Sequence, residues 1–354
     1  MDANTNTPEV ILGVDTHLDT HVGVVVDYLG RVLGTLEIST NTIGYQHLLD
    51  WASAFGELRR AGIEGTGTYG AGLARYLAGS GITVIEVNRP DRSRRRRRGK
   101  NDPTDAENAA RAVLSEEASA RPKSQSGVVE AMRALGVARR SAVKARTQAI
   151  NQLRGLLVSA PEAIRTVLLK PKIEDCIASC AQLSLTFTSP VEMGLNRALR
   201  LLAERWKNLT DELKQLDAAL EQLAKAAAPR LLEKFGVGPY TAATLLVAAG
   251  DNPERLHSEA ALAALCGVSP LEASSGKVSR HRLNRGGVRQ ANNALWTIAM
   301  VRMRSDERTK GYVTRRTQEG LSMKEIQRCL KRYIVRELYP LIVADLRNCS
   351  EVLT

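Results

Sequence analysis

Apolar residues in the first hundred positions fall into short runs separated by one longer helical pattern. β-branched residues dominate positions 10–14, 22–26 and 32–38, and a Tyr28-Leu29-Gly30 turn separates the last two runs. This composition predicts three consecutive strands joined as a meander. Residues 42–55 have helical spacing, and a strand around Ile63, a helix over 71–78 and a strand over 82–87 follow. The pattern predicts a mixed α/β unit.

The middle of the chain predicts long helices. Residues 128–159 and 192–228 contain no proline, and their apolar positions form a narrow stripe near coiled-coil spacing. We expect an antiparallel helical arm, with shorter helices at its tip where prolines punctuate residues 160–190. After residue 229 the composition shifts to small residues, glycines and arginines. The expected domains are therefore 1–120, 121–228 and 229–354, the last of them mostly α.

Four carboxylates stand where predicted strands end or a predicted helix begins. Asp15 closes the first strand, Glu64 closes the strand around Ile63, and Asp102 and Asp105 open a helix. A meander followed by alternating helices and strands is the order of an RNase H-like fold, in which the first and fourth strands end side by side. Clustered carboxylates suit hard cations such as Mg²⁺, which also bind substrate phosphates. We therefore expect a phosphodiester substrate.

Each acid also has a purely structural interpretation. Asp102 suits the N-cap of a helix, with Pro103 at N1 and Asp105 at N3, because acids there complement the helix dipole. Asp15 alone fits a turn, and Glu64 alone fits a solvated strand end. The joint pattern favours metal binding, because three separate segments deliver acids to one predicted edge of one sheet.

Composition points to a polyanionic partner. The chain has 354 residues, of which 50 are Lys or Arg and 38 Asp or Glu, giving a net charge of +12.

Five cysteines favour a reducing compartment, and Cys176 and Cys180 lack the further ligands of a zinc site. Neither a signal peptide nor an apolar run long enough to span a membrane is recognisable. We expect a cytoplasmic bacterial protein close to the nucleoid.

Basic segments predict contacts with a nucleic-acid backbone. Gly236 and Gly238 resemble a helix-hairpin-helix turn, in which backbone N–H groups approach a phosphate. Ordinary solvated or glycine-containing loops are the alternatives. The expected contacts are Arg92, Arg94, Arg95, Arg96, Arg97, Arg98, Lys100, Gly236, Gly238, Lys277, Arg280, Arg282, Arg285 and Arg289.

Two serines lie among the second group of cations. Ser274 and Ser275 precede Gly276, and a serine nucleophile gains from positive charge near the phosphate that it attacks. No Ser-His-Asp order is recognisable, and His281 cannot be assigned as a base. These residues alone leave open an ordinary loop.

Together the motifs resemble the DEDD-type insertion-sequence transposases, the bridge-RNA-guided serine recombinases. The resemblance rests on Gly13-Val14-Asp15, Thr20-His21-Val22, Glu64-Gly65-Thr66-Gly67, Lys100-Asn101-Asp102-Pro103-Thr104-Asp105-Ala106, Phe235-Gly236-Val237-Gly238-Pro239, Cys266-Gly267-Val268-Ser269-Pro270 and Ser274-Ser275-Gly276-Lys277. It implies a RuvC-like N-terminal domain whose four acids bind Mg²⁺. It also implies a C-terminal transposase domain with Ser275, or alternatively Ser274, as nucleophile. The arginine run over residues 94–98 departs from the family pattern.

The resemblance further implies strand cutting and rejoining through a phosphoserine link to DNA. The expected partners are donor and target DNA, a non-coding bridge RNA and further copies of the chain in a dimer or tetramer. The main alternative is a hydrolytic Holliday-junction resolvase or nuclease that uses water. An actin-like ATPase or sugar kinase needs additional glycine-rich phosphate loops, and a DNA-architectural protein needs no catalytic acids.

Overall fold

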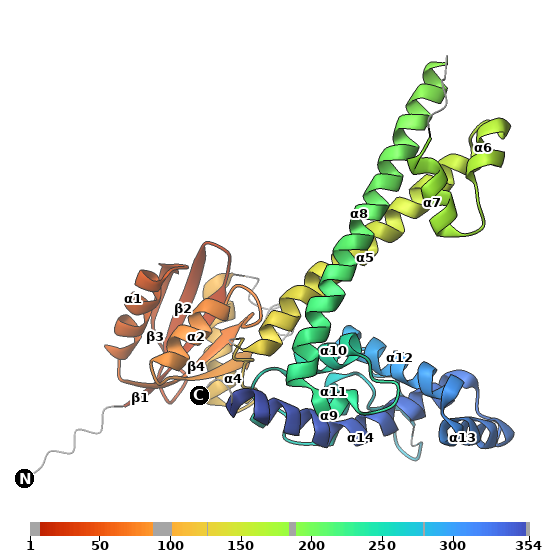
Figure 1. Cartoon of the computed structure of the whole chain (residues 1–354). Helices are drawn as coiled ribbons and strands as arrows, with labels where there is room; N and C mark the ends of the chain where they lie inside the picture. The colour runs from red at the N-terminus through yellow and green to blue at the C-terminus, as the bar shows by residue number, and fades with distance from the viewer. Residues whose placement is uncertain (1–7, 88–100, 126, 184–188, 279, 352–354) are drawn as a thin grey trace, which may run out of the picture. The chain divides into compact units, whose positions relative to one another are not determined.

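The computed structural model describes residues 8–87, 101–125, 127–183, 189–278 and 280–351. The chain forms two compact units, one of residues 1–125 with 252–257 and the other of residues 126–251 with 258–354 (Figure 1). These two units do not test the three domains expected from the sequence, which stay a prediction. Among the described residues no helix is both long and apolar enough to cross a membrane.

Five strands form the sheet of the first unit. They are β1 (Glu9–Thr16), β2 (Thr20–Val26), β3 (Val32–Ser39), β4 (Glu57–Glu64) and β5 (Thr83–Val87). Their order is β3-β2-β1-β4-β5; β1 to β3 are antiparallel neighbours, whereas β4 runs parallel to both β1 and β5. The predicted meander is confirmed. The ends of β1 and β4 lie side by side, because Val14 pairs with Ile63.

Helices cover both faces of this sheet. The helices α1 (Thr42–Ser53) and α2 (Ala71–Gly79) pack on one face, where Val10, Leu12 and Val14 of β1 join their core. Helix α4 (Asp102–Leu114) packs on the other face with Ile11. Side chains alternate between the faces of a strand, so Asp15 lies on the face that α4 covers.

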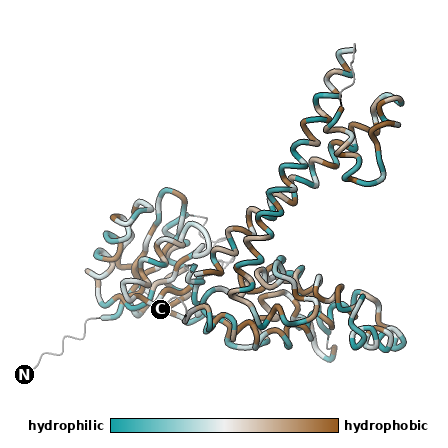
Figure 2. Tube along the Cα trace, viewed as in Figure 1, coloured by the Kyte–Doolittle hydropathy of each residue, from teal (hydrophilic) through white to brown (hydrophobic). Residues whose placement is uncertain are grey.

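Two long antiparallel helices dominate the second unit, as predicted. Helix α5 (Val128–Val158) packs against α8 (Pro190–Ala227), and hydrophilic and hydrophobic positions alternate along both (Figure 2). Arg139 forms an ion pair with Asp217, and the Arg146 guanidinium lies 5.7 Å from the Trp206 ring centroid. The residue that comes later in α5 contacts the residue that comes earlier in α8, as antiparallel packing requires. Coiled-coil geometry stays a prediction.

Short helices connect the two long ones. They are α6 (Glu162–Leu168) and α7 (Ile173–Ala181), which confirms the predicted helical tip. Cys176 and Cys180 lie in α7, and both are free and buried in the apolar core between the helices. Burial, with the neighbouring thiol, raises the pKa of Cys180 to about 12. Both cysteines therefore serve packing.

The remainder of the second unit is mostly helical. It contains α9 (Pro229–Leu232), α10 (Pro239–Ala249), α11 (Glu259–Leu265), α12 (Arg289–Ser305), α13 (Glu307–Gln318), α14 (Met323–Glu351) and the short strands β6 (Leu271–Glu272) and β7 (His281–Arg282). A 3₁₀ turn, Pro253–Arg255, belongs to the first unit. The apolar residues 245–249 mark only the later part of one of these helices. Helix α10 begins earlier, at Pro239, because proline is compatible with a first helical turn.

Candidate active site

Two glycines allow α4 to lie unusually close to the sheet. Gly13 of β1 and Gly62 of β4 are paired neighbours. A Cβ atom on Gly13 would lie 2.1 Å from the Ala106 carbonyl oxygen and 2.3 Å from the Ala110 nitrogen. A Cβ atom on Gly62 would lie 2.7 Å from the Ala109 carbonyl oxygen. Both positions therefore require glycine, and the close contact fixes α4 against the strand that carries the first acid.

The N-terminus of α4 presents two acids. Asn101 is the N-cap, because its Oδ1 accepts a hydrogen bond of 2.8 Å from the Thr104 backbone N–H. Asp102 and Pro103 are therefore the first two helical residues, and the interpretation of Asp102 as the N-cap is wrong. Asn and Asp both make good N-caps, so the sequence Asn101-Asp102 alone did not show which of the two residues caps the helix. With the cap supplied by its neighbour, the side chain of Asp102 can face the end of β1.

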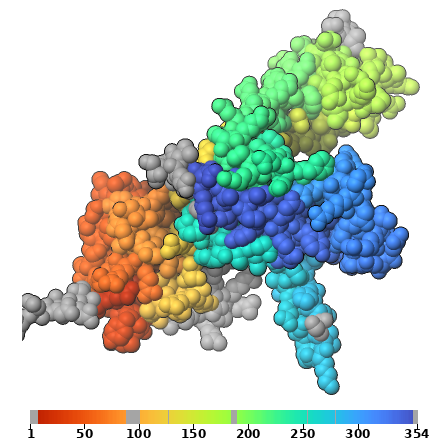
Figure 3. Space-filling view, turned by 60° about the horizontal axis from the view of Figure 1, so that its bottom comes forward, coloured from red at the N-terminus to blue at the C-terminus, as the bar shows by residue number. Residues whose placement is uncertain are grey.

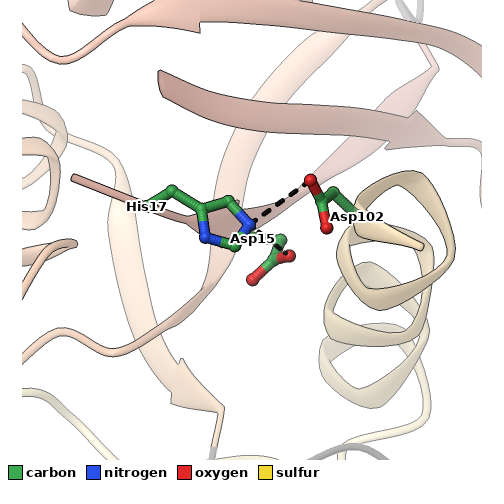
Figure 4. Close-up of side chains that lie close together, drawn as sticks. All are labelled: Asp15, His17 and Asp102. Carbon is green, nitrogen blue, oxygen red and sulfur yellow. Dashed lines mark ion pairs between the residues drawn. The ribbon is translucent and has the colours of Figure 1, made fainter. Parts of the chain in front are cut away.

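Asp15, His17 and Asp102 point toward one another at this end of the sheet (Figure 4). The His17 Nε2 atom lies 3.3 Å from Asp15 Oδ2 and 3.4 Å from Asp102 Oδ2. One potential ligand atom from each residue lies within 4.8 Å of the other two. Asp15 is buried, whereas His17 and Asp102 are partly exposed. The cluster therefore has both a buried anchor and an approach from solvent.

The electrostatics of the cluster favour a cation. Burial raises the pKa of Asp15, the adjacent His17 lowers it, and repulsion from Asp102 and Asp105 raises it. A divalent cation would relieve this repulsion between carboxylates. The two carboxylates suit hard cations such as Mg²⁺, and the imidazole nitrogen is a donor that divalent transition metals accept. The residues present therefore fit a divalent metal.

The other two predicted acids flank this cluster. Glu64 ends β4 on the face that α4 covers, and its carbonyl oxygen accepts a hydrogen bond of 2.9 Å from Thr16 Oγ1. Asp105 is buried in the first turn of α4 and is near enough to affect the pKa of Asp15. Among the described residues, the three ligand atoms that converge come from Asp15, His17 and Asp102. Joint metal binding by all four acids stays a prediction.

His17 is a site residue that the sequence analysis missed. It belongs to no motif recognised there, and a single histidine carries little information about its neighbours. One signal was present, because His17 lies two positions after Asp15 at the end of a strand. Side chains two positions apart on a strand share a face.

Ser274 and Ser275 lie in a β-hairpin that projects from the helical part of the second unit (Figure 3). The Ser275 N–H donates to the Val278 carbonyl at 3.0 Å, and the Val278 N–H donates to the Ser275 carbonyl at 3.1 Å. Gly276, at the first turn position between them, has φ +58°. That left-handed conformation is natural for glycine in a tight hairpin turn. The sequence left an ordinary loop open as one interpretation of these residues, and the structure shows a hairpin.

The two serine hydroxyls have different surroundings. Ser274 Oγ accepts a hydrogen bond of 3.3 Å from the Arg280 N–H, and the Arg280 Nε donates to the Ala273 carbonyl at 3.2 Å. Ser275 is exposed, and within the described residues its hydroxyl has no hydrogen-bond partner. Lys277, Arg280 and Arg282 are exposed cations of the same hairpin, and the exposed Arg285 and Arg289 follow it in the sequence. The hairpin therefore presents one uncommitted hydroxyl among positive side chains.

The glycine turn before α10 is internally bonded. Gly236 has φ +84°, a left-handed conformation that favours glycine. The Gly238 N–H donates to Thr241 Oγ1 at 2.9 Å, so a protein group already occupies this donor. Phosphate contact by these glycines stays a prediction. The predicted contacts Arg92, Arg94 to Arg98 and Lys100 lie outside the described residues.

Comparisons with known proteins match both halves of the chain. A model of the DEDD transposases of IS110, described as "Transposase", matches residues 12–160, and one described as "Transposase IS116/IS110/IS902 family" matches residues 228–314. One relative is a mini-circle protein of Streptomyces coelicolor that is named as a transposase for IS117. It is 25% identical over 93% of this chain and 93% of its own length. An uncharacterized 43.6 kDa protein of insertion element IS110, from the same organism, is 32% identical over 36% of this chain and 31% of its own length.

Proposed function

The chain belongs to the IS110 family of DEDD-type transposases, and we therefore propose that it cuts and rejoins DNA through a serine nucleophile and bound Mg²⁺. The observation that carries the proposal is the convergence of Asp15 and Asp102 beside His17, from segments far apart in the sequence. A transposase is a DNA-processing enzyme that binds DNA. The serine, the identity of the metal and the partners below are parts of the proposal.

We propose that the first unit is a RuvC-like member of the RNase H-like fold. The order β3-β2-β1-β4-β5, with an antiparallel meander and parallel β4 and β5, supports this assignment. So does the position of the acids, which lie at the ends of β1 and β4 and at the start of α4. The second unit would supply a coiled-coil arm from α5 and α8, followed by the C-terminal transposase domain.

Asp15, Glu64, Asp102 and Asp105 would hold the metal, with His17 as a further candidate ligand. Bound Mg²⁺ would supply charge stabilisation at the scissile phosphate. Asp15 is held in place by a buried strand and Asp102 by a capped helix. The protein's own contribution is therefore a rigid arrangement of charge, which costs no reorganisation when the substrate arrives.

Ser275 would be the nucleophile. Its Oγ atom forms a bond to phosphorus, the bond from phosphorus to a deoxyribose oxygen breaks, and the hydroxyl proton leaves with the departing strand or to water. A strand end of the other DNA then displaces the serine and restores the phosphodiester. The number of phosphate ester bonds is unchanged, so no external energy source is required. The exposed arginines of the hairpin would stabilise the added negative charge.

We further propose that copies of the chain assemble as a dimer or tetramer, with the acids of one subunit and the serine of another acting together. A non-coding bridge RNA would pair with donor and target DNA and so provide sequence recognition. The basic composition supports a scheme in which the protein binds phosphates and the RNA recognises the sequence. Arginine and lysine contacts to phosphates carry little sequence information.

A covalent protein–DNA adduct would test the chemistry. Protein purified from cells that carry its native flanking DNA is incubated with labelled junction DNA and Mg²⁺, and a denaturing gel then separates the products. We expect a boiling-resistant shifted band with the wild type and with Ser274→Ala, and none with Ser275→Ala or Asp15→Ala. If Ser275→Ala still forms the adduct, the serine assignment is wrong. Cleavage without any adduct would instead indicate the hydrolytic resolvase or nuclease.

A further inference from the structure

A groove in the second unit combines aromatic rings with arginines. Its cavity of about 830 Å³ is bounded by α12, α13, α14 and the turn before α10. Phe235, Tyr312 and Tyr333 line it, together with Arg308, Arg315 and Arg336. Only 4% of the chain is aromatic. Three rings around one cavity are therefore a local concentration, and we call this feature the aromatic groove.

Two of the three rings are exposed, and two pack against each other. Phe235 and Tyr333 are 54% and 52% exposed, so their surfaces are accessible. Tyr312 packs edge-on against Tyr333, with centroids 5.8 Å apart and planes at 84°, an arrangement that aromatic pairs favour. The Phe235 carbonyl accepts a hydrogen bond of 2.9 Å from Arg302 Nε. Ordered rings lose little conformational freedom when a ligand stacks on them.

The acids of the groove are already committed to protein partners. Glu337 forms a two-bond ion pair with Arg302, with distances of 2.6 and 3.0 Å. Asp306 caps α13 by accepting hydrogen bonds from the backbone and side chain of Thr309. The ion pair balances the charge of Glu337, whereas hydrogen bonds from Thr309 and the nearby Arg302 and Arg308 lower the pKa of Asp306 and favour its charged form. The lining contains more arginines than acids, so the groove keeps a net positive charge that favours an anion.

The remaining arginines are available to an anionic ligand. Within the described residues, neither Arg308 nor Arg336 forms an ion pair, and the Arg315 pair with Glu319 is long, at 3.8 Å. The Arg315 guanidinium lies 5.6 Å from the Tyr312 centroid, and that of Arg336 lies 5.9 Å from the Tyr333 centroid. Aromatic faces beside unpaired cations are the chemistry with which proteins bind single-stranded nucleic acid.

We propose that the aromatic groove binds an unpaired nucleobase of a single-stranded nucleic acid. The base stacks on Phe235 or Tyr333, and Arg308 and Arg336 contact the adjoining phosphates. A paired base inside a duplex cannot place its face against these rings, so the groove distinguishes single strands from duplexes. The proposal depends on the proposed function only in that nucleic acid is the partner, since it involves neither the acids nor the serines.

Fluorescence of 2-aminopurine tests this directly, because stacking quenches it. The probes are otherwise identical DNA and RNA single strands with 2-aminopurine at one internal position, scanned along the strand, and a DNA duplex. We expect quenching on binding of a single strand. We expect at least one of Tyr333→Ala and Phe235→Ala, the one that removes the stacking ring, to lose that quenching and to weaken binding about 5- to 150-fold. Tyr333→Phe should retain both properties because it keeps the ring.

The controls separate folding from binding. Tyr28→Ala removes an aromatic ring of similar exposure (66%) outside the groove and should bind like the wild type. Circular dichroism and thermal unfolding should show that all variants are folded; Phe235→Ala is the safer variant because its ring is largely exposed. Tighter binding of the RNA or of the DNA probe identifies which strand occupies the groove.

Two results would overturn the proposal. One is wild-type affinity and quenching in both alanine variants. The other is loss of self-association in those variants with oligonucleotide binding unchanged, which would make the groove a protein contact. Ser275→Ala should quench like the wild type. A failed covalent-adduct experiment with intact quenching would therefore refute the serine mechanism and leave the groove assignment standing.

Discussion

Gly13→Ala should disrupt both the packing of α4 and the arrangement of the acids. The new Cβ would lie 2.1 Å from a backbone oxygen of α4, whereas real Cβ contacts essentially never fall below 3.0 Å. Because the opposing atoms belong to the helix backbone, no side-chain rotation relieves the overlap. The helix must move by roughly 1 Å, and such overpacking typically costs about 1–3 kcal/mol. The same movement carries Asp102 away from Asp15.

Two measurements check this expectation. Urea denaturation should give a lower free energy of unfolding for Gly13→Ala, a smaller loss for Gly62→Ala, whose Cβ would lie 2.7 Å from its nearest atom, and little change for Gly79→Ala. Gly79 lies in α2 of the same unit and has no atom within 4 Å of its added Cβ. Stabilisation by added Mg²⁺ should also weaken in Gly13→Ala. Wild-type stability and wild-type Mg²⁺ stabilisation in Gly13→Ala would refute the packing argument.

Two other perturbations test local electrostatics. His17→Ala should lower the free energy of unfolding by at most about 1 kcal/mol in EDTA, because the ring is partly exposed. Added Mg²⁺ should widen this deficit, because the variant lacks one candidate ligand and gains less stability from the ion. A deficit independent of Mg²⁺ would mean that the ring serves only packing. Burial acts to raise the pKa of Asp27, but hydrogen bonds from the Arg31 N–H, the Arg31 guanidinium and the Leu29 N–H outweigh it and hold that pKa below its usual value. The resulting stability is present above an unfolded-state pKa of about 3.9 and is lost as the pH falls through the folded-state pKa. Asp27→Asn should therefore reduce the loss of stability on the acid side of a stability–pH curve. An unchanged acid side would contradict the assignment.

The strands and the long helices could be predicted because their signals are long and periodic. Positions 10–14 and 22–26 carry β-branched runs, and the arm helices extend over many turns. Strand topology then placed Asp15 beside the end of the fourth strand. The hairpin β6–β7 could not be predicted in this way, because strands of two residues have no periodicity to detect.

The details of the candidate site depended on contacts that a linear pattern does not contain. Asn101 and Asp102 are both suitable N-caps, and only the hydrogen bond to Thr104 decides between them. His17 became visible once the end of β1 and the start of α4 were placed together. The importance of Gly13 likewise follows from the closeness of α4, since a glycine in a strand has several explanations.

The acids and the serines are held with different rigidity, and the proposed reaction gives a reason for this difference. Asp15 and Asp102 are fixed by a buried strand and a helix packed against glycine, because electrostatic stabilisation depends on charges that need not reorganise. Ser275 lies at the exposed end of a hairpin with two-residue strands, a type of segment with low local stability. A nucleophile must approach phosphorus along a particular line, which substrate binding can establish. In the proposed reaction, the charges would be fixed in advance and the orientation of the hydroxyl would be set in the DNA complex.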